Sequence, residues 1–125
     1  MSITYVGKAE CAGLGGNTGS KTAFTYLAYG NDNLTTASPG QTTLQGTESQ
    51  RATATVSRQT SALGVANAKL RFTKTFTISK TETIGEVGAF NASSSGTMLC
   101  RDTINPVRSA KSGDTWTPTY DVNFA

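Results

Sequence analysis

The sequence contains no histidine. This absence removes the commonest general base, the Ser-His and Cys-His nucleophile systems and the commonest metal ligand. The two cysteines, Cys11 and Cys100, have no further ligands at the close spacing that a zinc site requires. The carboxylates are scattered, and a pair that cleaves glycosides needs a deep, rigid cleft, which a small domain of short strands seldom supplies. We therefore expect no enzymatic activity, no cofactor and no metal site.

Long apolar runs and clusters of one charge are also missing. No stretch approaches the length of a membrane span, and no two lysines or arginines are adjacent although the net charge is +3. A nucleic-acid-binding protein of this size usually shows clustered basic residues. The sequence therefore predicts no membrane partner and no nucleic-acid partner.

A secretory signal is not evident either, because residues 1–10 have neither a basic region nor an apolar region. We expect the chain to fold in a cytosol, where disulfides are disfavoured. Cys11 and Cys100 are therefore predicted to be free thiols, and a bridge between them is the alternative.

The residues that are present favour β-structure. The 125 residues fit one domain, residues 1–125. Threonine is the commonest residue, and it suits the solvent-facing side of a strand. Few leucines, glutamates and lysines are available to fill helices. Composition therefore indicates an all-β fold.

Alternation supports this interpretation. Between Lys69 and Ser79, apolar side chains occupy every second position, with one lapse at Lys74, and residues 115–124 alternate in the same way around Pro118. Shorter strands are predicted over residues 2–6, 21–29, 52–58, 84–90 and 98–102. The expected fold is a single small β-sandwich or barrel of short antiparallel strands. Its predicted core consists of Leu70, Phe72, Phe76, Ile78, Val87, Phe90, Trp116, Tyr120, Val122 and Phe124.

The N-terminal third is rich in turn residues. Cys11–Ser20 is predicted to be a loop or flexible arm, and one short helical turn is expected around Leu44. Residues 15–22, GGNTGSKT, lack the glycine that a phosphate-binding loop needs before its lysine. We expect residues 1–20 to form an N-terminal arm that lies against another subunit. Its few apolar side chains, the expected assembly contacts, are Ile3, Tyr5, Val6 and Leu14.

Two further groups of residues invite a functional interpretation. Glu86 lies inside an apolar strand and needs a partner, for which Arg101 on the return strand is the candidate. We expect a structural ion pair, with an intersubunit contact as the alternative. Four aromatic residues could form a sugar-binding platform, although alternation places them in the core: Tyr26, Tyr29, Trp116 and Tyr120.

The second half of the chain resembles a small structural-protein family of tailed bacteriophages and archaeal tailed viruses. The pattern is Glu-x-Gly-x-Phe-Asn-Ala, then Gly-Gly-Thr-Met-Leu-x-Arg, an apolar stretch and Gly-Asp-Thr. The matching residues are Glu86, Gly88, Phe90, Asn91, Ala92, Gly96, Thr97, Met98, Leu99, Arg101, Gly113, Asp114 and Thr115. Upstream, residues 42–51 resemble a Thr-x-Leu-x-x-Glu-x-x-Arg stretch of the same proteins through Leu44, Glu48 and Arg51. Ser95, where the pattern prefers glycine, and Cys100, at a usually small position, depart from it.

The resemblance implies a virion structural protein, made in the host cytoplasm and assembled into the particle. A capsid decoration or cement protein on the outside of the head shell is the leading hypothesis. It would bind the major capsid protein or neighbouring virion subunits, as a homo-oligomer. The alternatives are a tail-tip, fibre or collar component and, from another class, a glycan-binding module that uses Trp116.

Overall fold

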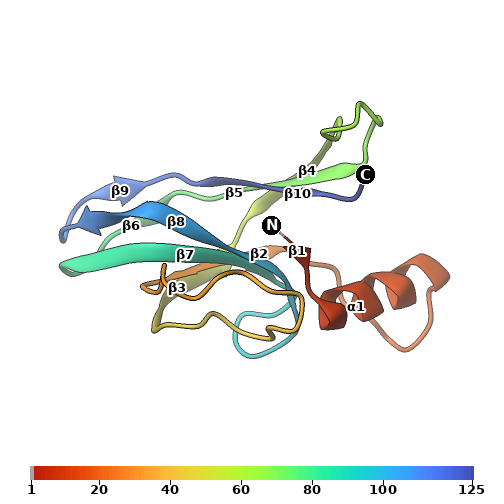
Figure 1. The fold of residues 1–125 in the computed structure, drawn as a ribbon, viewed down its shortest axis with the longest axis horizontal. Coiled ribbons are helices and arrows are strands. Elements are labelled where there is room, and N and C mark those ends of the chain that lie inside the picture. The colour runs from red at the N-terminus through yellow and green to blue at the C-terminus, as the bar shows by residue number, and fades with distance from the viewer. Residues whose placement is uncertain (1) are drawn as a thin grey trace.

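The computed structural model describes residues 2–125 and consists of two packed antiparallel β layers with a helix at one end (Figure 1). The larger layer is a five-stranded sheet of order β1-β8-β7-β2-β3. Its strands are β1 (Ser2–Ile3), β2 (Tyr26–Gly30), β3 (Glu48–Thr53), β7 (Glu82–Phe90) and β8 (Met98–Ala110). The second layer holds a three-stranded sheet, β10-β5-β4, and a two-stranded ribbon, β6-β9. These strands are β4 (Thr55–Gln59), β5 (Lys69–Thr73), β6 (Phe76–Thr77), β9 (Thr115–Trp116) and β10 (Thr119–Asn123). The predicted all-β, sandwich-like fold is confirmed.

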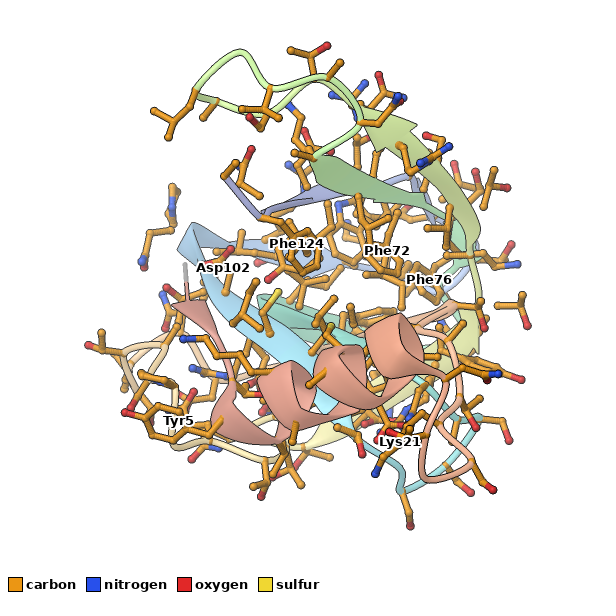
Figure 2. All side chains as sticks on the ribbon, turned by 90° about the vertical axis from the view of Figure 1, so that its right-hand side faces the viewer. Tyr5, Lys21, Phe72, Phe76, Asp102 and Phe124 are labelled. Carbon is orange, nitrogen blue, oxygen red and sulfur yellow. The ribbon has the colours of Figure 1, made fainter. Side chains whose placement is uncertain are left out.

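The two long strands predicted near the middle and the end of the chain are each divided. Residues 69–79 form β5 and β6 with an interruption that begins at Lys74, and residues 115–124 form β9 and β10 with an interruption that includes Pro118. The interruptions lie opposite each other, because Thr119 pairs with Thr73 and Trp116 pairs with Phe76. The alternation of inward and outward side chains continues through the interruption. Phe72 and Phe76 are therefore both buried between the layers, as Figure 2 shows.

The core between the layers includes most of the predicted residues. Phe72, Phe76, Ile78, Val87, Tyr120 and Val122 belong to one buried cluster, whereas Phe90 packs on the other face of the larger sheet. Leu70 and Trp116 are half-buried at its border. The prediction for Phe124 is wrong: this side chain is 46% exposed, because β10 ends at Asn123 and the residue lies past the last strand pair.

The N-terminal segment differs most from expectation. Ser2–Ile3 is a strand, but Tyr5–Gly16 is the helix α1, so the predicted loop at Cys11–Ser20 is wrong over its first half. The Thr4 side chain accepts a hydrogen bond from the Gly7 amide at 2.9 Å and so caps the helix N-terminus. A Cβ on Gly7 would lie 2.8 Å from the Leu99 carbonyl oxygen, so glycine allows the helix to approach β8 closely. Gly7 and Gly13 are the buried residues of this helix, whereas Gly15 and Gly16 in its last turn are exposed.

This helix is the only one in residues 2–125, and with 12 residues it does not have the length to cross a bilayer. β1 pairs with β8, where Ile3 lies opposite Cys100. Ile3 and Cys11 pack against the core cluster. Residues 2–16 thus fold onto the domain itself.

Other elements also differ from the sequence-based prediction in their presence or bounds. The helical turn expected around Leu44 is absent; this residue is buried in an irregular loop. The strand expected over residues 52–58 is shared between two sheets, because β3 leaves the larger sheet and continues after Ala54 as β4. β8 is longer than predicted, and residues 104–107 bulge out of register between the pairs Glu86–Thr103 and Ile84–Arg108.

Candidate functional site

The predicted pair of Glu86 and Arg101 is present and buried. Arg101 Nε lies 2.7 Å from Glu86 Oε1, and the two side chains are 1% and 0% exposed. Arg101 faces Gly88 across the β7–β8 ladder, so the two charged side chains meet diagonally on one face of the sheet. This is the face away from the second layer, where Leu44, Phe90 and Met98 also pack.

Glu86 has further partners that the sequence did not indicate. Its Oε1 accepts a hydrogen bond from the Gln45 amide at 2.8 Å. Its Oε2 accepts from the Gly46 amide at 2.8 Å and the Asp32 amide at 3.2 Å. The carboxylate therefore binds both ends of one long loop, residues 31–47, which we call the clamped loop.

Arg101 binds the same loop from the other side. Its guanidinium donates to the Thr35 carbonyl oxygen at 2.7 Å and to the Asp32 carbonyl oxygen at 3.1 Å. The Asp32 carboxylate lies 3.6 Å from the guanidinium. Hydrogen bonds from Thr35 and from the Leu34 amide hold the pKa of Asp32 below its ordinary value, with a further contribution from Arg101. The loop is thereby fixed to the sheet by charge-assisted bonds.

Glycines make room for this arrangement. A Cβ on Gly30, which pairs with Glu86 across β2 and β7, would lie 2.6 Å from Glu86 Oε2. A Cβ on Gly85 would lie 2.8 Å from the Asn31 carbonyl oxygen. The carboxylate could not sit against the sheet, nor the loop against the carboxylate, if these positions carried larger residues.

A second ion pair borders the first. Arg51 on β3 forms a bidentate pair with Glu48 at 2.7 and 3.0 Å, and its guanidinium lies 3.7 Å from the centre of the Phe90 ring. It also donates to the Ala92 and Ser95 carbonyl oxygens at 3.2 and 2.8 Å. The turn after β7 is thus held to β3.

The contacts of this site give it a structural role. A buried ion pair costs desolvation energy and is tolerated where geometry and extra hydrogen bonds compensate. Among residues 2–125, no buried side-chain nitrogen or oxygen lacks a partner. The Arg101 and Glu86 side chains are 1% and 0% exposed, and their polar atoms bind each other and the clamped loop. The network stabilises a long loop that has no regular structure of its own.

The clamped loop carries the most exposed large apolar side chain of the described chain, Leu34, which is 90% exposed. The Asn33 side chain donates to the Asn105 side chain at 2.8 Å, which ties this loop to the β8 bulge and its half-exposed Val107. The Tyr5 amide donates to the Pro39 carbonyl oxygen at 2.8 Å, so the start of α1 adjoins the same loop. The β8 bulge and the start of α1 therefore both adjoin the clamped loop, and each of the three segments carries an exposed apolar side chain: Leu34, Val107 and Tyr5.

The four expected assembly contacts are not equivalent. Ile3 packs against the core cluster and is only half-accessible. Tyr5, Val6 and Leu14 are 65%, 38% and 38% exposed on α1. Figure 2 shows Tyr5 at the start of the helix, pointing away from the layers. Tyr5 alone is bonded to the clamped loop through its backbone; the other two lie elsewhere on the helix.

The four aromatic residues considered as a sugar platform do not form an exposed row. Tyr29 and Tyr120 are buried, and Tyr29 makes edge-to-face contacts with Phe76 and Trp116 at 5.0 and 5.2 Å. Tyr26 packs on the opposite face of the larger sheet. Trp116 alone borders a hollow, of about 160 Å³. The geometry therefore gives the glycan alternative little support.

The cysteines are both free thiols, as predicted. Burial raises the pKa of Cys100 to about 12, although a 2.8 Å hydrogen bond with the Tyr120 hydroxyl acts in the opposite direction. Burial, and then the neighbouring Glu10 carboxylate, raise the pKa of Cys11.

These shifts predict low thiol reactivity. Since the thiolate is the nucleophile, iodoacetamide should leave Cys100 unmodified in the folded protein at neutral pH, whereas half-buried Cys11 should react slowly and faster as pH rises. Mass spectrometry of the alkylated protein, with a sample unfolded in urea as the control, counts the modified thiols. Native Cys100 reacting as fast as Cys11 would contradict the buried position of this residue.

Comparison with known proteins adds no assignment. No family model matches the sequence, and neither a curated protein nor a solved structure matches it.

Proposed function

We propose that the chain is a structural protein of a tailed-virus particle, most specifically a decoration or cement protein on the outside of the head shell. The observation that carries the proposal is the position of the residues that resemble the virion family. Among those that carry charge, Glu86 and Arg101 bind the clamped loop, and Glu48 and Arg51 form the bordering pair. Asp114 accepts a hydrogen bond from the Lys111 amide in the turn before β9 and borders the hollow beside Trp116.

The roles can be read individually. Glu86 and Arg101 form the buried pair, Glu48 and Arg51 form the bordering pair, and Leu44 anchors the clamped loop in the apolar cluster. Asn91 accepts a hydrogen bond from the Thr97 amide at 2.7 Å and so closes the turn between β7 and β8. These residues hold loops in fixed positions on a rigid β framework. A protein that binds a shell through its surface loops requires such a framework.

The surface that we propose for binding is that formed by the clamped loop, the β8 bulge and the start of α1. An exposed leucine on a loop that is fixed in advance binds with a small loss of conformational entropy. The proposed partner is the major capsid protein or a neighbouring virion subunit, and repeated copies around a symmetric shell would make the contact cooperative.

The proposal predicts that Leu34→Asp weakens loading without unfolding the protein. A charge at the centre of an apolar contact should weaken binding to particles by about 2 kcal/mol or more, which is roughly thirtyfold. The measurement is co-sedimentation of the full chain with particles that lack it. The matched control is Leu63→Asp, because Leu63 is 81% exposed on the β4–β5 hairpin, away from the clamped loop.

Two results would contradict this account. If the native chain does not sediment with particles of any kind, the virion role is wrong. If Leu63→Asp weakens loading and Leu34→Asp does not, the virion role stands and the surface is elsewhere. Binding only to isolated tails would favour the tail-tip, fibre or collar alternative.

A further inference from the structure

Lys74 is the residue that interrupts the alternation of residues 69–79, and the proposed binding surface does not use it. It lies between β5 and β6, half-buried, at the level where the chain passes from the three-stranded sheet to the ribbon. In the described part of the chain it makes no ion pair, whereas Lys69, at the other end of β5, has the carboxylate of Asp121 at 3.6 Å. A cation at such a position, partly removed from water and without a counter-charge, needs an explanation.

The interruption opens a hollow beside this lysine. At the same level β3 gives way to β4 at Ala54, so two neighbouring segments change sheets together. The hollow between them has a volume of about 390 Å³. Its lining residues are Thr53, Ala54, Thr55, Thr73, Lys74 and Thr75.

The lining is chemically uniform. The lining residues are four threonines, one alanine and one lysine, and no carboxylate residue is among them. Within residues 2–125 only Thr75 among these four uses its hydroxyl internally, in a 2.9 Å hydrogen bond with Thr117. Three hydroxyl groups and the ammonium therefore remain as donors to a ligand.

We propose that this hollow binds an oxyanion, the sulfate or phosphate group of a free ion or of an ester. Lysine binds phosphate-like groups as a point charge, and hydroxyl groups supply hydrogen bonds to the several acceptor oxygens of a tetrahedral anion. The inference is independent of the virion role, because no residue of the clamped loop lines this hollow, which lies where β3 gives way to β4.

Each of the eight carboxylate side chains already has a partner within its own chain: Glu10, Asp32, Glu48, Glu82, Glu86, Asp102, Asp114 and Asp121. An external sulfate or phosphate group could accept hydrogen bonds from the unused donors of the hollow without breaking any of these internal contacts.

The experiment follows backbone amide shifts of the full chain by NMR while sodium sulfate or phosphate is added at constant ionic strength against chloride. We expect saturable shifts at Thr53, Thr55 and Thr73 through Thr75. Lys74→Gln should weaken the affinity by roughly tenfold or more, the effect of losing one charge-assisted hydrogen bond. Lys80→Gln is the matched control, since Lys80 is an exposed lysine that does not line this hollow.

A second variant, Thr73→Val, removes one hydroxyl group at nearly constant side-chain shape. It should also weaken sulfate binding, and it tests the site if Lys74→Gln folds poorly. Sulfated dextran binding more tightly than free sulfate, with no binding of neutral dextran, would identify an ester on a polymer as the ligand; equal affinity per sulfate would identify the free ion. The proposal is overturned if shifts do not saturate, if Lys80→Gln has the same effect as Lys74→Gln, or if acetate binds as well as sulfate.

Discussion

Replacing Arg101 with methionine should lower the free energy of unfolding by about 3–5 kcal/mol, which is the usual penalty for leaving one member of a buried ion pair without its partner. Glu86 would keep three backbone donors but lose its counter-charge, and the carbonyl oxygens of Asp32 and Thr35 would lose their donor. Urea denaturation measures the change as a shift of the midpoint at constant slope.

The matched control is Arg108→Met. Arg108 is also on β8, but it is exposed, and the same substitution there should change stability by less than about 0.5 kcal/mol. Arg101→Lys should fall between the two, because it keeps the charge and loses the planar fork that binds several acceptors at once. An Arg101→Met variant within about 1 kcal/mol of the native protein would show that the pair does not stabilise the fold in the way proposed.

Replacing Phe72 with alanine should also cost about 3–5 kcal/mol. The ring is fully buried between the layers, and its strand pairs on both sides with β4 and β10, so the cavity cannot close by movement of one edge. Thermal and urea unfolding both measure the loss.

Phe124→Ala is the matched control for this prediction. The side chain is nearly half-exposed beyond the end of β10, and its removal should cost less than about 1 kcal/mol. Equal losses for the two variants would mean that the C-terminal residues belong to the core, as alternation alone had suggested.

These two pairs of variants also separate what the sequence could predict from what it could not. Alternation identified the inward face of residues 69–79 correctly, because side-chain period does not change when a strand is interrupted. The interruption arises because residues 69–73 and residues 76–77 join different sheets. The strands that pair with each segment are distant in the sequence, so the local pattern does not show where the interruption falls. Lys74 and Pro118 were the only local signs of it.

The helix was missed for a related reason. α1 buries Gly7 and Gly13 rather than a stripe of large apolar residues, so its sequence has no helical periodicity and reads as a loop. The Thr4 hydroxyl also donates to the Met98 carbonyl oxygen, and Gly7 lies close to Leu99; these contacts are with β8, almost a hundred residues away, and composition cannot reveal them.

The Glu86–Arg101 ion pair was also predicted only in part. A carboxylate inside an apolar strand indicated that a partner was needed, and the hairpin placed Arg101 within reach. Sequence reasoning did not find the clamped loop, because its three amides that bind Glu86 come from residues 32, 45 and 46 and have no side-chain signal. Glycines at 30, 46 and 85 were the available sign of a crowded site.

The measurement that tests the central claim most directly is the copy number of this chain in purified particles, by quantitative mass spectrometry against the major capsid protein. A decoration role predicts a ratio fixed by shell symmetry, with the chain retained on heads separated from tails. Absence of the chain from purified particles would contradict the virion role, and a few copies confined to tails would replace decoration with a tail component.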